Sequence, residues 1–158
     1  MKILVADIGG THVKLLASGR RVPVKLDSGP DLTPRMMVRR VLEATSGWRY
    51  DAVTLGYPGP VLHGRPLSDP HNLAGGWKRF DFARAFGCPV RIVNDAAMQA
   101  LGSYDGGRML FLGLGTGLGS ALVEDGVLLP LELAHLPYKS GGTFEDYLGV
   151  RGLEQHGY

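Results

Sequence analysis

Two glycine-rich turns contain the residues of this chain best suited to hold phosphate. The first covers residues 7–11, with the sequence Asp-Ile-Gly-Gly-Thr, and the second covers residues 113–119. Each follows an apolar run typical of a buried strand and leads into another apolar run. Because glycine has no Cβ, successive backbone N–H groups in such a turn can approach phosphate oxygens closely. The matched pair predicts a duplicated phosphate-binding hairpin; two ordinary tight hairpins are the alternative.

Polar side chains at predicted strand ends form a second group. Asp7 ends the first strand, where its carboxylate could hold a hydrated Mg²⁺ against a bound phosphate. Asp95 follows Asn94 where a strand gives way to a helix, and a carboxylate there could accept the proton of an attacking hydroxyl. Helix capping is the alternative for the pair Asn94 and Asp95. Glu132 and His135 share a face on a helical turn, which suits either the hydroxyls of a sugar or a solvated turn.

A long segment without clear periodicity, residues 61–79, is predicted to be an irregular loop, and loops of this length are usually functional. Gly-Tyr-Pro-Gly-Pro at 56–60 precedes it, and it contains Asn72 and Trp77. Amide and backbone donors beside an aromatic ring suit a carbohydrate. The alternative is a rigid turn beside a tryptophan of the core.

The candidate residues lie at the ends of predicted strands and helices, so the order of these elements determines where the residues are placed. The strand–turn–strand pattern at the start of the chain returns near residue 109, which predicts an α/β duplication. We expect a first half at 1–107 and a second at 108–158, with the second incomplete because the later elements of the first have no counterpart. Predicted strands cover 2–7, 13–17, 22–26, 51–57, 90–93, 109–112, 121–123 and 127–130; predicted helices begin at 33, 80, 94 and 143.

Composition excludes several classes of protein. The 158 residues include 17 basic and 15 acidic side chains, well mixed, so no nucleic-acid-binding signature is present. A lone cysteine, Cys88, excludes an internal disulfide and a Cys-rich zinc site. The sequence shows neither a signal peptide nor an apolar run long enough for a membrane helix, so we expect a cytoplasmic protein.

Together these motifs resemble the ROK family of sugar kinases and sugar-responsive repressors, and more narrowly its polyphosphate-glucokinase branch. The resemblance implies an actin/hexokinase-like, ribonuclease-H-type duplicated fold with a cleft between its halves. It covers the whole chain, and the motifs occur in the family's order at 7–11 with Lys14, 56–59, 72–73, 94–95, 115–119, 132–135 and 144–147.

The resemblance also implies an activity and a role for each motif. It implies phosphoryl transfer from ATP or polyphosphate to the 6-hydroxyl of a hexose, with glucose as the first candidate, Asp95 as the base and Asp7 on Mg²⁺. The sugar would be held by Gly59, Asn72, Asn94, Glu132, His135 and Glu145. The phosphates would be held by Gly9, Gly10, Thr11, Lys14, Gly115, Thr116 and Gly117.

The chain departs from the family at three points. Ala134 replaces the usual glycine before the histidine, and residues 139–143 replace a Cys-rich segment, so we expect no structural zinc. Family members also continue beyond residue 158, so we expect a fragment, a natural truncation or a proteolytic product. The uncovered apolar surface of such a fragment favours self-association.

Two other functions stay open at this point: a sugar-binding fragment without catalysis, and a ROK-type sugar-responsive regulator. The regulator is disfavoured, because those proteins carry a DNA-binding domain first and here the first phosphate strand begins at residue 2. The donor, the exact hexose and the oligomeric state are not decided by the sequence.

Overall fold

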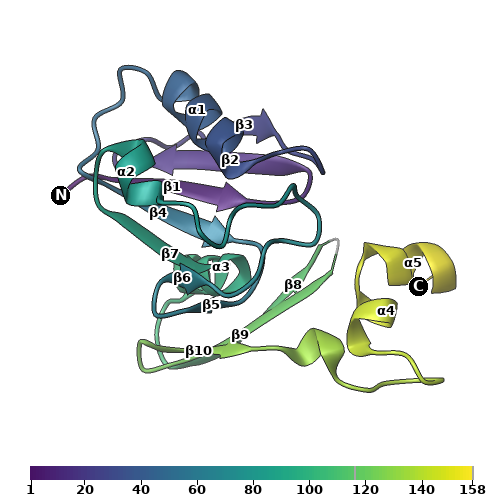
Figure 1. Ribbon diagram of the computed structural model, residues 1–158. Helices are drawn as coiled ribbons and strands as arrows, with labels where there is room; N and C mark the ends of the chain where they lie inside the picture. Colours follow the sequence, from purple (N-terminus) through teal and green to yellow (C-terminus); the bar gives the residue numbers. More distant parts are fainter. Residues whose placement is uncertain (116, 158) are drawn as a thin grey trace. The chain divides into compact units, whose positions relative to one another are not determined.

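The computed structural model describes residues 1–115 and 117–157 (Figure 1). Its contacts divide the chain into two compact units, Met1–Asp95 and Ala96–Tyr158, called unit 1 and unit 2 below. This division measures where contacts are dense. The boundary predicted at 107–108 separates two halves of similar strand–turn–strand pattern, which the density of contacts does not test, and it stays a prediction.

Unit 1 is built on a five-stranded mixed sheet in the order β3-β2-β1-β4-β7. Three strands form the predicted antiparallel meander, and the other two run parallel to β1. Apolar residues alternate between faces along β1 and β2, as period-two strands require. The bounds are Ile3–Ile8 (β1), His12–Ala17 (β2), Val24–Asp27 (β3), Ala52–Tyr57 (β4) and Val90–Asn94 (β7).

Two helices of unit 1 lie beside each other over the sheet (Figure 1). Helix α1, Pro34–Ala44, begins as predicted: Thr33 is its N-cap and accepts a hydrogen bond from Met36 N at 3.2 Å. Helix α2, Phe82–Phe86, begins two residues later than predicted, because the side chain of Asp81 caps it by accepting from Arg84 N at 3.0 Å.

The core of unit 1 lies between the sheet and its helices. Its largest fully buried side chains include Trp77, Tyr57 and Met37, together with alternate residues of β1, β2 and β4. Tyr57 and Trp77 pack ring to ring, with centroids 6.1 Å apart. Trp77 is therefore a tryptophan of the core. The expectation that its ring forms part of a surface for a carbohydrate is wrong.

The long loop after β4 contains a small hairpin that the sequence did not reveal. Strands β5, Val61–Leu62, and β6, Arg65–Pro66, pair antiparallel. Their turn uses two residues with positive φ, His63 at 49° and Gly64 at 73°. Two-residue strands have no measurable periodicity, so this hairpin could not be predicted from alternation.

Unit 2 contains a three-stranded antiparallel sheet in the order β10-β9-β8, and helix α3, Asp95–Ser103, supplies its core with Ala100. Ala100 packs with Ala121 and Val123 of the sheet. The strands are β8 (Arg108–Leu114), β9 (Leu118–Glu124) and β10 (Val127–Leu131), which confirms the second strand–turn–strand pattern.

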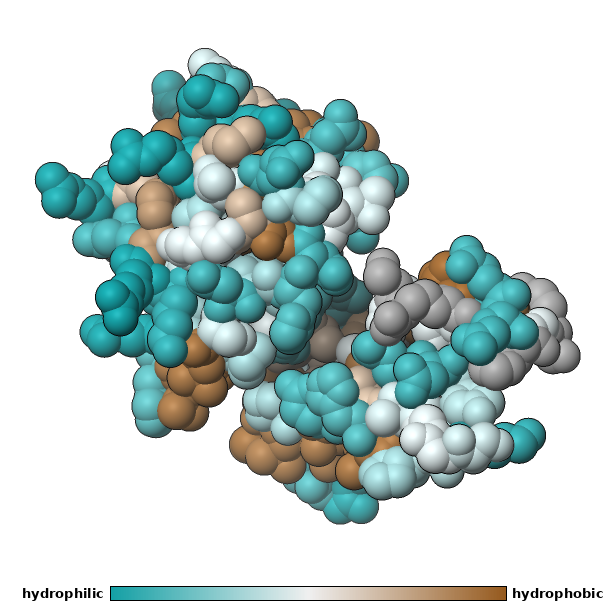
Figure 2. Space-filling view, turned by 45° about the vertical axis from the view of Figure 1, so that its right-hand side comes forward, coloured by the Kyte–Doolittle hydropathy of each residue, from teal (hydrophilic) through white to brown (hydrophobic). Residues whose placement is uncertain are grey.

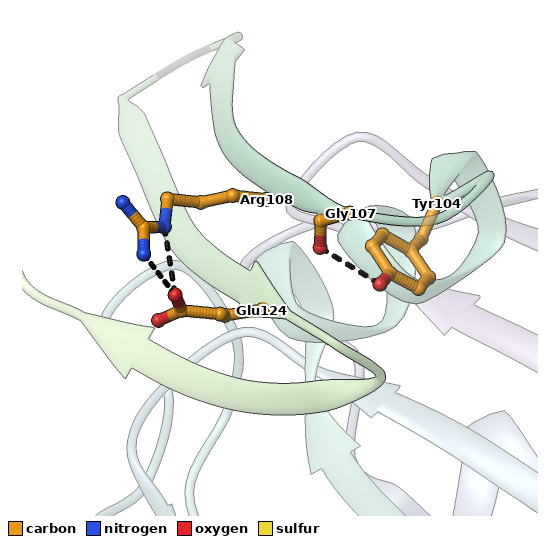
Figure 3. Close-up of polar contacts among 4 residues, drawn as sticks. All are labelled: Tyr104, Gly107, Arg108 and Glu124. Carbon is orange, nitrogen blue, oxygen red and sulfur yellow. Dashed lines mark hydrogen bonds and ion pairs between the residues drawn. The ribbon is translucent and has the colours of Figure 1, made fainter.

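Polar contacts hold the start of this sheet (Figure 3). Arg108 and Glu124, opposite each other in β8 and β9, form an ion pair in which Arg108 Nε donates to Glu124 Oε1 at 2.8 Å. The Tyr104 hydroxyl donates to Gly107 O at 2.9 Å and accepts from Gly126 N at 3.0 Å. Tyr104 thereby ties the end of α3 to both neighbouring turns.

The last part of unit 2 is helical. A short 3-10 turn, η1 (Leu133–His135), is followed by α4 (Phe144–Leu148) and α5 (Val150–His156). The predicted start is confirmed: Thr143 is the N-cap, and Asp146 accepts from Thr143 N at 2.8 Å. The prediction of one continuous helix over 143–156 is wrong, because extended backbone at Gly149 (φ −86°, ψ 178°) separates α4 from α5.

One face of the β8–β10 sheet carries several exposed apolar side chains, beside Leu118 and Ser120, which are buried on the same face. Alternate residues of these strands pack against α3, and those between them point to the other face. We call the exposed residues of that other face the leucine face; Figure 2 shows such a hydrophobic area on this unit. Its members and exposed fractions are Leu110 (53%), Leu112 (47%), Leu114 (62%), Val127 (59%) and Leu129 (44%).

Candidate functional site

The carboxyl ends of β1, β4 and β7 meet at one edge of the unit 1 sheet, because the three strands are parallel. Register places Asp7 opposite Gly56, and Tyr57 opposite Asn94. Asp7 and Asn94, together with the residues that follow β1, β4 and β7, therefore lie at the same end of the parallel strands. Open α/β sheets bind ligands at such an edge, in the loops that follow the strands.

The first glycine-rich turn lies at this edge and touches the long loop. Gly9 N donates to His12 O at 2.9 Å, which closes the β1–β2 hairpin, and Thr11 O accepts from Ser28 N at 2.9 Å. Gly10 approaches Asn72 so closely that a Cβ added to it would lie 3.3 Å from the Asn72 Cβ. The structure thus brings a predicted phosphate-binding turn against a predicted sugar-binding amide.

Asp7 and Lys14 form a cross-strand pair on β1 and β2, with 3.9 Å between Oδ2 and Nζ. The Asp7 side chain is 17% exposed and that of Lys14 is 54% exposed, so the pair is open to solvent from the lysine side. Among the described residues no group of three His, Cys, Asp or Glu could form a metal cage. A single carboxylate beside a phosphate turn still fits Mg²⁺, which keeps most of its waters and binds phosphate oxygens.

Asn94 and Asp95 are half-buried at the junction of β7 and α3. Asn94 Nδ2 donates to Gly59 O at 3.2 Å, so two predicted sugar-binding positions are in contact. Asp95 is the first residue of α3, where the partial positive charge of the helix N-terminus favours an ionised carboxylate. That location fits a proton acceptor and also fits a helix-stabilising acid.

The loop that carries Asn72 is fastened by Asp69. Its carboxylate accepts hydrogen bonds from Gly76 N at 3.0 Å and Lys78 N at 2.8 Å, and these bonds lower the pKa of Asp69 below its ordinary value. The reasoning from sequence missed this residue. The available signal was an aspartate before a proline with Gly75-Gly76 downstream, a composition typical of side-chain-closed turns.

In unit 2, Glu145 contacts the second glycine-rich turn. Its carboxylate accepts a hydrogen bond from Leu118 N at 3.2 Å, and it lies where any Cβ on Gly117 would be. Val150 N donates to Gly115 O at 2.9 Å, so the start of α5 also holds the turn. A predicted sugar-binding acid and predicted phosphate-binding glycines are thus adjacent. Thr116 lies outside the described residues.

Glu132 is the N-cap of the predicted helical turn, η1, and His135 is its last residue; both are exposed. Ser120, which is 4% exposed, fixes the chain there: its Oγ donates to Leu131 O and accepts from Leu133 N, both at 3.1 Å. Reasoning from the sequence did not select Ser120 as a positioning residue. The one signal was a hydroxyl within an apolar strand.

Another glycine of the second turn region allows a close approach between strand and helix. A Cβ on Gly119 would lie 2.9 Å from the Ala96 Cβ, closer than real side-chain carbons come. Gly119 therefore lets the first turn of α3 pack directly on β9.

The predicted groups fall into two sets. Those at 7–14, 59, 72, 94 and 95 belong to unit 1, and those at 115, 117, 132, 135 and 145 belong to unit 2. Each set gathers phosphate-type and sugar-type residues within its own unit. The pairing of the two turns across a cleft stays a prediction.

Comparison with known proteins reveals relatives in sequence and in fold. No family model matches the chain. Polyphosphate glucokinase of Mycobacterium tuberculosis is 29% identical over 151 residues, covering 82% of this chain and 56% of that protein. The chain thus spans just over half the length of such curated relatives.

Solved structures resemble it along nearly its whole length. The inorganic polyphosphate/ATP-glucomannokinase from Arthrobacter sp. strain KM superposes with a TM-score of 0.80 and 27% identity, covering 99% of this chain and 71% of that one. The ROK hexokinase from Thermus thermophilus superposes with a TM-score of 0.70 and 25% identity, covering 98% and 62%.

The fold is therefore the α/β, actin/hexokinase-like fold of the ROK sugar kinases, as predicted. More narrowly, the chain is a homologue of proteins named polyphosphate glucokinase, which confirms the resemblance found in the sequence. Within the described part of the chain, every helix is too short or too polar to span a lipid bilayer.

Proposed function

We propose that this chain supplies sugar- and phosphate-binding elements of a hexose kinase, which transfers a phosphoryl group from ATP or polyphosphate to the 6-hydroxyl of glucose. The observation that carries the proposal is the shared strand edge in unit 1. There Asp7, the turn at 9–11, Asn72, Asn94 and Asp95 follow or adjoin parallel strands in register. The names of the homologues support the same reaction class.

Asp95 is the proposed base. Its carboxylate takes the proton of the 6-hydroxyl, whose oxygen forms the new bond to phosphorus as the bond to the donor's leaving oxygen breaks. Asn94, Asn72 and the Gly59 backbone orient the sugar in unit 1. In the same proposal Glu132, His135 and Glu145 contact the remaining sugar hydroxyls.

The glycine-rich turns hold the donor phosphates. Their backbone N–H groups, with the hydroxyl of Thr11 and the ammonium of Lys14, offset phosphate charge in unit 1, and Gly115, Thr116 and Gly117 do so in unit 2. Asp7 would hold Mg²⁺, which when bound neutralises phosphate charge. The Asp7–Lys14 pair keeps both charges at the mouth of the same turn.

The test is the substitution Asp95→Asn, which keeps size and hydrogen-bonding capacity but removes the basic group. We expect kcat for glucose phosphorylation to fall about 10² to 10⁴-fold, with glucose affinity by calorimetry largely kept. Asp31→Asn, at an exposed position outside the site, is the matched control and should leave kcat unchanged. Near-normal turnover in Asp95→Asn would remove Asp95 from the role of base.

A second candidate, a sugar-binding fragment without catalysis, is favoured by one observation: the chain matches just over half the length of curated relatives. Calorimetry separates the two functions. Glucose binding together with binding of ATP or polyphosphate supports the kinase, whereas glucose binding alone supports the fragment.

A further inference from the structure

Unit 1 contains a hollow whose lining includes none of the residues of the candidate site. It lies between α1 and the α2 segment and has a volume of about 770 Å³. Small-molecule sites in proteins generally measure roughly 300–1,000 Å³. We call it the α1–α2 groove. None of the proposed sugar, phosphate or metal residues lines it, so the kinase proposal leaves it unexplained.

The rim of the α1–α2 groove is strongly basic. Four arginines line it, Arg35 and Arg39 from α1 and Arg79 and Arg84 from the α2 segment, against two acids. Arg35 and Arg39 are one helical turn apart, where like charges repel unless an anion lies between them. The excess of cations in one hollow favours an anionic occupant.

The two acids offset only part of this excess. Glu43 pairs with Arg39 at 3.8 Å, in a contact exposed on both sides. Asp81 uses its carboxylate to cap α2 through Arg84 N. Among the described residues, the guanidinium groups of Arg35 and Arg84 form neither a hydrogen bond nor an ion pair, so both are available to an added ligand.

The floor of the groove is apolar. It includes Val38, Leu42, Phe80 and Ala85, and Leu42 is 39% exposed. Phe80 packs edge-on against Phe82, with ring centroids 4.9 Å apart and planes at 67°, so its ring is held in one orientation. An inorganic anion would leave these apolar side chains exposed to water, whereas a ligand with a flat apolar body would bury them.

We propose that the α1–α2 groove is a binding site for an organic phosphate with a flat apolar body, the chemical class to which nucleotides belong. The body lies on Phe80 and Leu42. The phosphate groups lie between Arg35 and Arg84, since a guanidinium binds phosphate oxygens in a bidentate manner. This site is separate from the proposed phosphoryl-transfer site.

Hydrogen exchange with ADP as the probe tests the inference, because it reports which segments become protected. We expect ADP to protect residues 35–43 and 79–85. In the double variant Arg35→Gln/Arg84→Gln, the ADP concentration for half-protection should rise about tenfold or more, as the loss of two charge-assisted contacts implies. Phe80→Leu should also raise it.

The matched control is the double variant Arg65→Gln/Arg91→Gln, which removes two exposed arginines outside the groove and should behave as the unmodified chain. Urea midpoints check that all variants fold alike. Absence of protection in the two segments, equal protection in the Arg35/Arg84 variant, or equal protection by inorganic tripolyphosphate would each overturn the proposal. No turnover is measured, so this test stands or falls independently of the proposed kinase function.

Discussion

The fold constrains the protonation of Tyr57. Its side chain is fully buried, and its hydroxyl donates to Ser68 O at 2.8 Å, which attaches the long loop to β4. Burial, and secondarily the charge of Asp69, raise the pKa of Tyr57 well above its usual range. The neutral phenol is therefore part of the folded structure.

The substitution Tyr57→Phe should reveal this linkage. The folded pKa lies above the unfolded value of about 10, so the stabilisation by Tyr57 is complete below pH 10 and declines as pH rises beyond it. At neutral pH the variant should lose about 0.5–1.5 kcal/mol with the hydrogen bond. Above about pH 10 its free energy of unfolding should fall less steeply with pH than that of the parent.

Urea denaturation across a pH series measures both effects. Tyr138→Phe is the control, because the Tyr138 side chain is 52% exposed and donates no hydrogen bond among those described. It should keep the parent's slope. Parallel pH dependences for Tyr57→Phe and the parent would contradict the assignment.

At the scale of elements, the segment from β10 to η1 depends on one hydroxyl. Ser120 accepts from and donates to the backbone on either side of Glu132, and it is almost fully buried. Exposed Glu132 and His135 have no comparable anchor of their own in the described contacts. The orientation of η1 therefore follows from a residue of β9.

Ser120→Ala should lower the free energy of unfolding by about 1–3 kcal/mol, because a part-buried N–H of Leu133 and a part-buried carbonyl of Leu131 lose their hydrogen bonds to it. It should also raise the KM for glucose more than it lowers kcat if Glu132 and His135 hold the sugar. Urea denaturation and steady-state kinetics measure the two effects. Ser103→Ala, which removes an exposed hydroxyl bonded to Gln99 O, should change neither appreciably.

The elements were predictable where local chemistry alone sets them. Thr33 followed by Pro34 marked the start of α1, and apolar alternation marked β1 and β2. The break at Gly149 was not predictable, because its extended backbone accompanies the contact from Val150 N to Gly115 O, a tertiary interaction. Local signals fix where elements begin, whereas tertiary contacts decide where they bend.

The residues of the candidate site also divide into those that local sequence reveals and those that depend on tertiary contacts. Residue types and motif order pointed to Asp7, Asn94 and Asp95, which chemistry singles out at strand ends. They could not point to Asp69 or Ser120, which act through backbone hydrogen bonds to segments distant in sequence. Such supporting roles depend on geometry that a side chain's type does not reveal.

At the scale of the molecule, the leucine face is a group of exposed apolar side chains that no described element covers. It lies on the β8–β10 sheet, of which β8 is an edge strand. Exposed apolar faces beside open strand edges promote association. The self-association expected from sequence stays a prediction, and this face is the surface on which it should depend.

The double variant Leu110→Thr/Leu112→Thr tests that dependence, since threonine suits strands but buries less apolar area. We expect the concentration of half-association to rise roughly tenfold or more. Sedimentation velocity over a concentration series measures it. Leu62→Thr/Leu67→Thr removes two exposed leucines of unit 1 and should leave association unchanged; a parent chain that is monomeric at every concentration would refute the prediction.

The close packing of Gly119 on Ala96 has a consequence for genetics. In a random mutagenesis screen for lost activity, alanine or serine at codon 119 should score as null, although the residue touches no proposed substrate. The added carbon would displace the first turn of α3, which begins with Asp95. Such a variant would look like one that damages a phosphate-binding loop. Restoration of activity by a second substitution, Ala96→Gly, would show that the cause is the contact between residues 119 and 96.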